Sequence, residues 1–425
     1  MYLNLIDELK NDTQALEARD MIKDCVHCGM CLGACPTYGI VGDELDSPRG
    51  RIYQIKNLLE GTADLSSVQH HLDRCLTCRS CETACPSGVK YGHLLEWGRG
   101  FLAKKHRRGM VSRLKINGFR QVLTQPVLFG ALWKTASAVS GALPSAYANK
   151  LKPAALAPSN VTIPSVESID VTVILHQGCV QNTMSPNINH ATMRLLQAWG
   201  VTVLNANDGC CGAIAAHTDD ASGARQMAAH NLAAWEVVFK LHPKALILSN
   251  ASGCGVQLKD YGHAFKHDEA YAALAMRISA AVRDVSELVA EILDKQPLIK
   301  SALRARIDAL PKTATRMAYH EPCTLQHGQK LKGRVAQMLS ELGLSLTPSV
   351  NTHLCCGSAG AYSVMQPELS KQLLSNKIND LKLDEAAGVL SANIGCICHI
   401  ASATDKPVLH WVEWLEAVWS NDGRI

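Results

Sequence analysis

Short apolar runs alternate with longer amphipathic segments beyond residue 165. The runs VTVIL and ALIL, at 171–175 and 245–248, are bounded by turn-forming residues and predict buried strands. Residues 187–199 and 223–241 carry Ala, Leu and Met at helical spacing and predict helices that pack on one face. Strand alternating with helix predicts an α/β sheet whose loops gather at the strand ends.

The same pattern returns about 145 residues later, with strands expected at 316–320 and 389–392 and helices at 333–342 and 367–383. Four cysteines keep register between the two copies, at separations of 144, 145, 145 and 142 residues. They are Cys179 with Cys323, Cys210 with Cys355, Cys211 with Cys356, and Cys254 with Cys396. A repeat this long is typical of a duplicated domain rather than of a solenoid.

The N-terminal part has a different pattern, because amphipathic stretches at 51–59 and 68–74 separate two cysteine runs. Both runs read C-x2-C-x2-C-x3-C-P, which is the spacing of bacterial ferredoxins that hold [4Fe–4S] clusters. In such runs the fourth cysteine ligates the other cluster. The expected ligand sets are therefore Cys25, Cys28, Cys31 with Cys85, and Cys75, Cys78, Cys81 with Cys35.

A pair of zinc knuckles is the alternative interpretation of these runs. Zinc sites use two pairs of ligands and have no need of a third cysteine followed by Cys-Pro. Between the runs, Arg49 and Arg51 could offset the negative charge of a cluster, meet an acidic partner, or begin a solvated helix.

The predicted fold is multidomain, with a mostly helical two-cluster ferredoxin domain followed by a duplicated α/β cysteine-rich domain. The ferredoxin domain is expected at 1–137, and a linker rich in Ala, Pro and Ser at 138–168. The two Cys-Cys-Gly domains are expected at 169–300 and 301–425. Within the first domain, the fairly apolar residues 118–137 predict a helix packed on that domain, or else a surface for a membrane or a partner.

Composition narrows the functional classes. The 425 residues are 47% apolar, enough for two or three globular domains, and the net charge of +4 gives no reason to invoke nucleic acid. The start of the chain lacks the basic and apolar regions of a signal peptide, and no apolar run reaches eighteen residues. Because clusters need reduced thiols, we expect a reducing cytoplasm rather than a secreted disulfide framework.

Two ferredoxin runs followed by two Cys-Cys-Gly units resemble the iron–sulfur subunits of a known group of redox complexes. These complexes are glycolate oxidase, anaerobic glycerol-3-phosphate dehydrogenase, lactate-utilisation complexes and heterodisulfide reductase. The similarity to the glycolate oxidase subunits covers nearly the whole chain. The segments that carry it are CVHCGMCLGACPTYGIVGDELDSPRGRIY, HLDRCLTCRSCETACPSGVKY, ASGCG, CTLQHGQKL, HLCCGSAGAY and ANIGC.

The resemblance implies an electron-transfer subunit that takes electrons from FAD-binding subunits oxidising glycolate to glyoxylate. It further implies a respiratory acceptor such as quinone, and a peripheral position on the inner face of the bacterial inner membrane. The chain itself has no G-x-G-x-x-G after a strand and no P-loop. A cluster moves one electron at a time, so we expect no catalytic residue here and no activity without the partners.

Two alternatives remain open at this point. The same electron-transfer subunit could belong to a complex that oxidises D-lactate or glycerol-3-phosphate, since nothing in this chain contacts the substrate. A heterodisulfide-type thiol enzyme is the other, but its motif ends in C-x2-C. Here the first unit ends at Cys254 alone, and the second at Cys396-Ile397-Cys398, so we do not expect Cys398 to be a ligand.

The Cys-Cys-Gly units themselves predict metal binding, because adjacent cysteines in a glycine-rich loop are matched by two distant ones. We expect a third centre, a [4Fe–4S] cluster or a structural zinc ion, at Cys323, Cys355, Cys356 and Cys396. The set Cys179, Cys210, Cys211 and Cys254 is a second candidate. Histidines near the second-unit set could also serve a metal: His320, His327, His353 and His399.

Overall fold

The structure, a computed structural model, describes residues 2–138, 156, 166, 168–421 and 423. Most of the linker predicted at 138–168 therefore lies outside the described residues. The chain divides into two compact units, each built from separate segments. The first unit comprises residues 1–120, 214–221 and 353–377, and the second comprises 121–213, 222–352 and 378–425.

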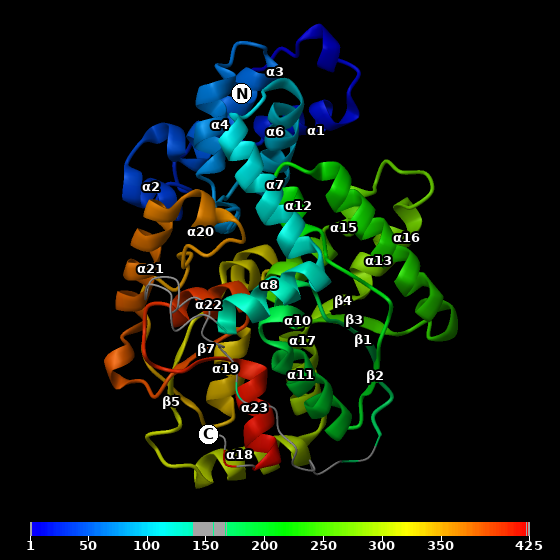
Figure 1. Cartoon of the computed structure of the whole chain (residues 1–425), viewed down its shortest axis with the longest axis vertical. Coiled ribbons are helices and arrows are strands. Elements are labelled where there is room, and N and C mark those ends of the chain that lie inside the picture. The colour runs from blue at the N-terminus through cyan, green and yellow to red at the C-terminus, as the bar shows by residue number, and fades with distance from the viewer. Residues whose placement is uncertain (1, 139–155, 157–165, 167, 422, 424–425) are drawn as a thin grey trace. The chain divides into compact units, whose positions relative to one another are not determined.

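The first unit is helical in its described residues. Its N-terminal helices are η1 (Asp7–Leu9), α1 (Thr13–Lys23), α2 (Pro36–Val41), η2 (Glu44–Asp46), α3 (Pro48–Leu59), α4 (Leu65–Asp73), α5 (Ser80–Thr83), α6 (Tyr91–Lys105) and most of α7 (Met110–Thr124). The later segments add most of α12 (Ala213–His217), α20 (Tyr362–Met365) and much of α21 (Pro367–Leu381). Figure 1 shows the N-terminal helices in blue and cyan.

Local sequence explains where these helices begin. The side chains of Asp12, Ser47 and Asp64 accept hydrogen bonds from the first turns of α1, α3 and α4, and Pro48 follows Ser47 at the first helical position. The apolar faces of α1, α3, α4 and α6 pack into one core that also contains Cys75 and Cys81. The helices predicted at 51–59 and 68–74 are confirmed as α3 and α4.

The second unit contains two four-stranded sheets, and every pairing in them is parallel. One sheet has the order β2-β1-β3-β4 and the other β6-β5-β7-β8. Their strands are β1 (Thr172–His176), β2 (Thr202–Leu204), β3 (Leu246–Ser249), β4 (Val282–Asp284), β5 (Arg316–Tyr319), β6 (Ser345–Leu346), β7 (Val389–Ser391) and β8 (Val408–His410). The four predicted strands are confirmed as β1, β3, β5 and β7.

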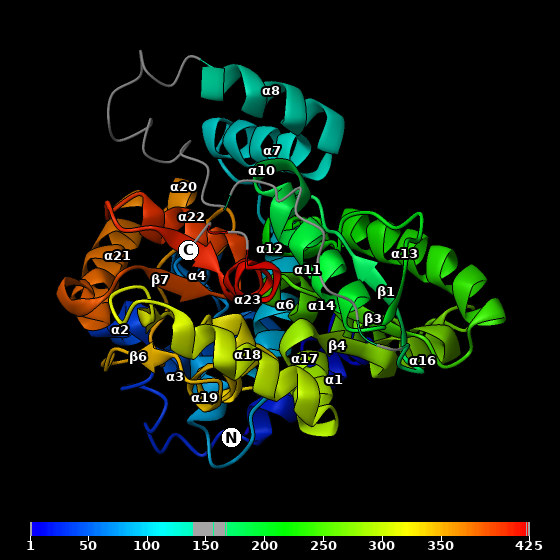
Figure 2. The same ribbon diagram turned by 90° about the horizontal axis from the view of Figure 1, so that it is seen from below.

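Helices connect the strands, and a central group packs between the sheets. The helices are α8 (Pro126–Ala138), α10 (Val180–Met184), α11 (Pro186–Ala198), α13 (Ala221–Leu241), α14 (Ser252–Lys259), α15 (Tyr261–Ala264), α16 (Ala272–Ala281), α17 (Val285–Lys295), α18 (Pro297–Ala309), η5 (Thr324–Gly328), α19 (Arg334–Glu341), η6 (Leu383–Glu385), α22 (Ile394–Ala401) and α23 (Trp411–Ser420). Figure 2 shows α11, α17, α18 and α23 between the two sheets. One apolar core joins these helices with β1, β5 and β7, so the two α/β repeats share their interior.

The repeats also match in their helix caps. Asp284 begins α17 with a capping box completed by Glu287, and His410 begins α23 with one completed by Glu413. The structure thus places strand, cap and helix in the same order in both copies. The helices predicted at 187–199, 223–241, 333–342 and 367–383 are confirmed as α11, α13, α19 and α21.

The fairly apolar residues 118–137 form the end of α7 and most of α8. Each of these helices fully buries one residue, Ile116 in α7 and Phe129 in α8. Among the described residues, no helix combines the length and apolar character needed to cross a bilayer.

Candidate metal centres

One cavity in the first unit is lined by the cysteines expected to hold the first cluster. Cys25, Cys28, Cys31 and Cys85 all border it, and Cys81 reaches it as well. Burial, followed by the nearby sulfurs of Cys25 and Cys85, raises the pKa of Cys31 to about 11. Cys85 therefore lies with the first run rather than with its own. Cys28 is exposed and the other three expected ligands are half-buried, so this cavity opens close to the surface.

A second cavity in the same unit is lined by Cys35, Cys75, Cys78 and Cys81. All four cysteines are buried. Burial raises the pKa of the Cys81 thiol, and the neighbouring sulfurs of Cys78, Cys75 and Cys35 raise it further. Four sulfurs around one enclosed space match the donor set that a [4Fe–4S] cluster requires, and binding would displace the thiol protons.

The two cysteine runs fold alike because both bend through the left-handed backbone region at equivalent positions. His27 and Thr77 have φ values of 56° and 55°, and Gly29 and Arg79 have values of 81° and 59°. Such residues reverse the chain between successive cysteines and allow each run to wrap around a common centre. Pro36 then begins α2 directly after Cys35.

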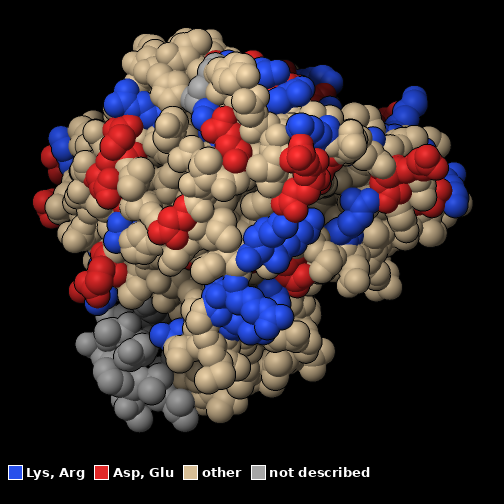
Figure 3. Space-filling model, turned by 90° about the horizontal axis from the view of Figure 1, so that it is seen from above, with Lys and Arg blue, Asp and Glu red and all other residues tan. Residues whose placement is uncertain are grey.

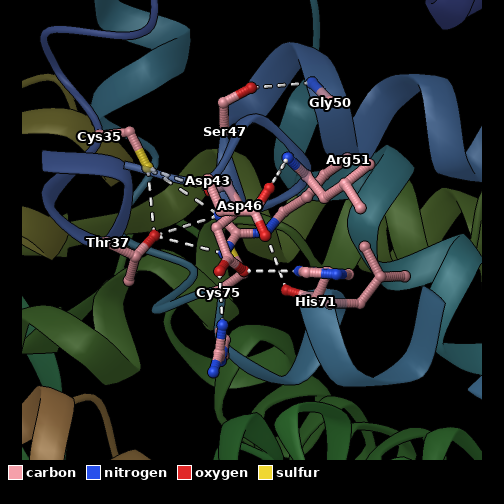
Figure 4. A network of polar contacts seen from close by, with 12 residues as sticks. Cys35, Thr37, Asp43, Asp46, Ser47, Gly50, Arg51, His71 and Cys75 are labelled. Atoms are coloured by element: carbon pink, nitrogen blue, oxygen red, sulfur yellow. Dashed lines mark hydrogen bonds and ion pairs between the residues drawn. The ribbon is translucent and has the colours of Figure 1, made fainter. Parts of the chain in front are cut away.

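A buried polar network, shown in Figure 4, supports the second cavity. Asp46, which is fully buried, lies 3.2 Å from the guanidinium of Arg51, 2.7 Å from that of Arg74 and 3.0 Å from Nδ1 of His71. Arg51 also donates to the hydroxyl of Thr37 at 3.2 Å. Only 1% of Arg51 is exposed, so the interpretation of this arginine as part of a solvated helix start is wrong.

Arg51 and Tyr91 both approach sulfurs of the second set. A guanidinium nitrogen of Arg51 lies 3.9 Å from Sγ of Cys35, and the hydroxyl of Tyr91 lies 3.6 Å from Sγ of Cys75. Burial lowers the pKa of Arg51, but Cys75, Tyr91, Cys35 and Asp46 together raise it above its ordinary value. Two donors, one of them cationic, thus face thiolates in a buried site, where they would stabilise added negative charge.

Replacement of Tyr91 by Phe is expected to lower the reduction potential of one cluster only. The ring keeps its packing, while the second set loses a hydrogen bond to Cys75. An EPR-monitored redox titration measures the two potentials. Tyr53, which is 49% exposed, provides the control, because Tyr53→Phe should leave both potentials unchanged. An unchanged titration for Tyr91→Phe would show that its hydroxyl does not tune a cluster.

The first Cys-Cys-Gly set comes together within the second unit. Sγ of Cys179 lies 3.2 Å from Sγ of Cys210, and ligand atoms of Cys211, Cys254 and His176 lie within 4.8 Å of one another. A hydrogen bond from the Cys211 thiol lowers the pKa of Cys254 to about 6, although burial opposes this shift. The hydrogen bonds within the set act in opposite directions, because they raise the pKa of Cys179 and Cys211 but lower that of Cys210 to about 3. Thiolate, the form that binds metals, is therefore favoured at Cys210 and Cys254 of this set.

His176 is the member of this group that sequence analysis missed. It ends β1, and its counterpart His320 follows β5 in the second copy, each three residues before a cysteine. Burial lowers the pKa of His176, but hydrogen bonds with Asp208 and Cys254 outweigh it and raise the pKa to about 10. The spacing His-x2-Cys, present in both repeats, was the available signal.

The glycine after each Cys-Cys pair is required by its backbone. Gly212 and Gly357 have φ values of 88° and 90°. A Cβ on Gly212 would lie 3.0 Å from the carbonyl oxygen of Ala224, and one on Gly357 would lie 2.8 Å from that of Ser370. Only glycine combines the left-handed conformation with this close approach.

The cysteines expected to form the third centre are divided between the compact units. Cys323 and Cys396 belong to the second unit, whereas Cys355 and Cys356 belong to the first. Cys355 accepts a hydrogen bond from the backbone of Gly357 at 3.4 Å, and all four cysteines are buried. Of the histidines named above, His320 and His327 are buried in the second unit, His399 is half-buried on α22, and His353 lies in the first unit.

Two sequence families match the chain, one in its N-terminal part and the other at both α/β repeats. The family described as a 4Fe-4S dicluster domain matches residues 21–89. The family described as a cysteine-rich domain matches twice, at residues 173–259 and 317–401.

Relatives extend the similarity over nearly the whole chain. The glycolate oxidase iron-sulfur subunit of Escherichia coli (strain K12) is 42% identical over 417 residues, covering 98% of each chain. The probable glycolate oxidase iron-sulfur subunit of Bacillus subtilis (strain 168) is 28% identical, covering 94% of this chain and 93% of the relative. Lactate utilization protein A of Anoxybacillus flavithermus is 24% identical over 56% of this chain and 93% of its own length.

Proposed function

Because this chain belongs to the family of glycolate oxidase iron–sulfur subunits, we propose that it carries electrons from flavin-bearing subunits that oxidise glycolate to a respiratory acceptor. The observation that carries the proposal is the pair of cysteine-lined cavities in a chain 42% identical to such a subunit over nearly its full length. Two [4Fe–4S] clusters, bound there, supply one-electron chemistry.

The residues proposed as ligands are Cys25, Cys28, Cys31 and Cys85 for the first cluster, and Cys75, Cys78, Cys81 and Cys35 for the second. Exposure distinguishes the two sites, because Cys28 reaches the surface whereas all four cysteines of the second set are buried. Apolar side chains surround the exposed position, since Val26 is 68% and Met30 is 63% exposed. This rim suits contact with a redox partner, which would exchange electrons through the first site.

Side chains of this chain would determine which of the two clusters is more easily reduced. Arg51 and Tyr91 place a buried cation and a hydroxyl against the second set and favour its reduced state. Exclusion of water from this site strengthens both interactions. In the proposed direction, electrons therefore enter at the exposed first site and rest at the second.

The Cys-Cys-Gly sets are proposed to bind further metal. Cys323, Cys355, Cys356 and Cys396 would hold a third [4Fe–4S] cluster or zinc, and Cys179, Cys210, Cys211 and Cys254 would form a comparable set whose thiols already converge within the second unit. Metal analysis of Cys355→Ser, which removes one donor of the third centre alone, tests the first assignment. An unchanged metal content would contradict it.

We further propose that the chain binds flavin-bearing partner subunits and passes electrons to quinone. It would lie peripherally at the inner face of the inner membrane. The isolated chain should not turn over glycolate, since it offers clusters but no recognisable dinucleotide site. D-lactate is the competing substrate, because lactate utilization proteins match over half of the chain.

Co-purification from the native host, with flavin and iron analysis, tests the function. We expect the complex to reduce an artificial acceptor with glycolate far faster than with D-lactate, and the separated chain to be inactive. Preference for D-lactate would move the chain to the alternative substrate. FAD bound to the single chain, together with glycolate turnover, would contradict an electron-transfer role.

A further inference from the structure

His176 lies at the carboxyl end of β1, where parallel sheets commonly place functional groups. Its side chain is buried, and one of its ring nitrogens lies within 4.8 Å of the sulfurs of both Cys211 and Cys254. Three donors at such separations could bind a single metal centre after small side-chain movements. With the neighbouring Cys210 they would form a Cys₃His set, which is common in protein metal sites.

The orientation of the imidazole is fixed from the opposite side. Nδ1 of His176 lies 2.8 Å from Oδ2 of Asp208, and the same carboxylate oxygen accepts a hydrogen bond from Nε1 of Trp235 at 3.2 Å. Nε2 is buried and has no oxygen or nitrogen partner among the described residues. A carboxylate behind one ring nitrogen, with the other nitrogen directed at thiols, is the arrangement of metal-bound histidines.

We propose that Nε2 of His176 is a metal ligand in the first Cys-Cys-Gly set and that Asp208 is the residue that positions it. This rests on the proposed metal-binding role of that set, and not on the electron path through the two ferredoxin sites. The shared chemistry is that of a thiophilic metal bound by thiolates and one imidazole, either a zinc ion or iron in a cluster.

The second copy differs at the corresponding position. Nδ1 of His320 lies 2.9 Å from the hydroxyl of Ser391, whereas Nδ1 of His176 lies 2.8 Å from a carboxylate oxygen of Asp208. A carboxylate makes the imidazole a stronger donor than a hydroxyl does. The residue two positions before the cysteine pair is Asp208 in the first copy and His353 in the second, so the two copies differ at the position that supplies this carboxylate.

The test compares full-length wild-type protein with His176→Asn, His176→Cys and Asp208→Asn. His410→Asn is the matched control, because His410 is a buried histidine of the same unit that caps α23, and asparagine can also cap a helix. Zinc and iron are counted per chain. X-ray absorption at the zinc edge, or nitrogen hyperfine coupling to a reduced cluster, reports whether an imidazole is bound.

We expect a bound imidazole in the wild type and in His410→Asn, and none from this centre in His176→Asn. Asp208→Asn should keep the ligand but weaken metal affinity about 10–100-fold. His176→Cys should keep the metal with sulfur in place of nitrogen.

An imidazole signal that persists unchanged in His176→Asn would overturn the proposal. So would wild-type metal coordinated by sulfur alone, or wild-type protein with no metal at this set, because His176 and Asp208 would then form a purely structural ion pair. Electron transfer through the ferredoxin sites would survive either result. Loss of glycolate-linked reduction with an intact His176 signal would instead count against the proposed function.

Figure 3 shows one face on which groups of Lys and Arg side chains lie beside groups of Asp and Glu, with uncharged areas between them.

Discussion

Replacement of Asp46 by Asn is expected to destabilise the first unit by about 3–5 kcal/mol, because it breaks a buried ion pair while leaving Arg51 inside. Arg74 and His71 lose the same partner, so three groups are affected by one substitution. Asn has almost the same shape as Asp, and the effect therefore reports charge rather than packing. The urea concentration at which cluster absorbance is lost measures it.

Asp64 is the matched control for this experiment. It is exposed, and its carboxylate accepts a hydrogen bond from the backbone of Ser66 at the start of α4. Asp64→Asn should cost less than about 1 kcal/mol, since asparagine also caps helices. Equal urea midpoints for the two variants would contradict the assigned importance of the buried network.

The same network gives the stability a defined pH dependence. Burial raises the pKa of Asp46, but hydrogen bonds from His71 and Arg74 and the charge of Arg51 outweigh it, and the net shift is downward. A carboxyl whose pKa is lowered on folding contributes stability above its unfolded pKa of about 3.9, and that contribution is lost as the pH falls through the folded value. Stability from this source is thus constant near neutral pH and disappears only in strong acid.

Sequence predicted the parts of the fold that have strong local signals. The strands β1, β3, β5 and β7 contain short apolar runs, and amphipathic patterns predicted α11, α13, α19 and α21. The strands β2, β4, β6 and β8 were not predicted, because their pairing with neighbours far along the chain defines them. The spacing of apolar residues within one segment contains no information about which distant segment it pairs with.

Sequence predicted cysteine ligands and offered Arg51 as a cation near a cluster, but it contained no signal for the buried carboxylate of Asp46. Asp46 and Arg51 are charged residues, which are solvated in most proteins, so only the folded structure reveals their burial. The grouping of 214–221 and 353–377 with the N-terminal region likewise leaves no local pattern. His176 was recoverable, since the spacing His-x2-Cys occurs in both repeats.

Replacement of Cys85 by Ser is expected to remove the first cluster and to spare the second. Although Cys85 closes the second cysteine run, it lines the cavity bordered by Cys25, Cys28 and Cys31. Serine is a poor substitute for a thiolate at iron, so about four irons per chain should be lost. The coupled EPR signal of the reduced wild type should then become that of a single cluster. Cys398→Ser serves as the control and should change neither measurement.

Double variants decide which cluster is affected. If Cys85 and Cys28 serve the same cluster, the variant that combines Cys85→Ser with Cys28→Ser should still hold the other cluster. Combining Cys85→Ser with Cys78→Ser should remove both, because Cys78 lines the second cavity. The opposite result, with both clusters lost in the first combination and one kept in the second, would assign Cys85 to its own run. The prediction that the fourth cysteine of each run ligates the other cluster would then be wrong, although the two cavities group the cysteines in this way.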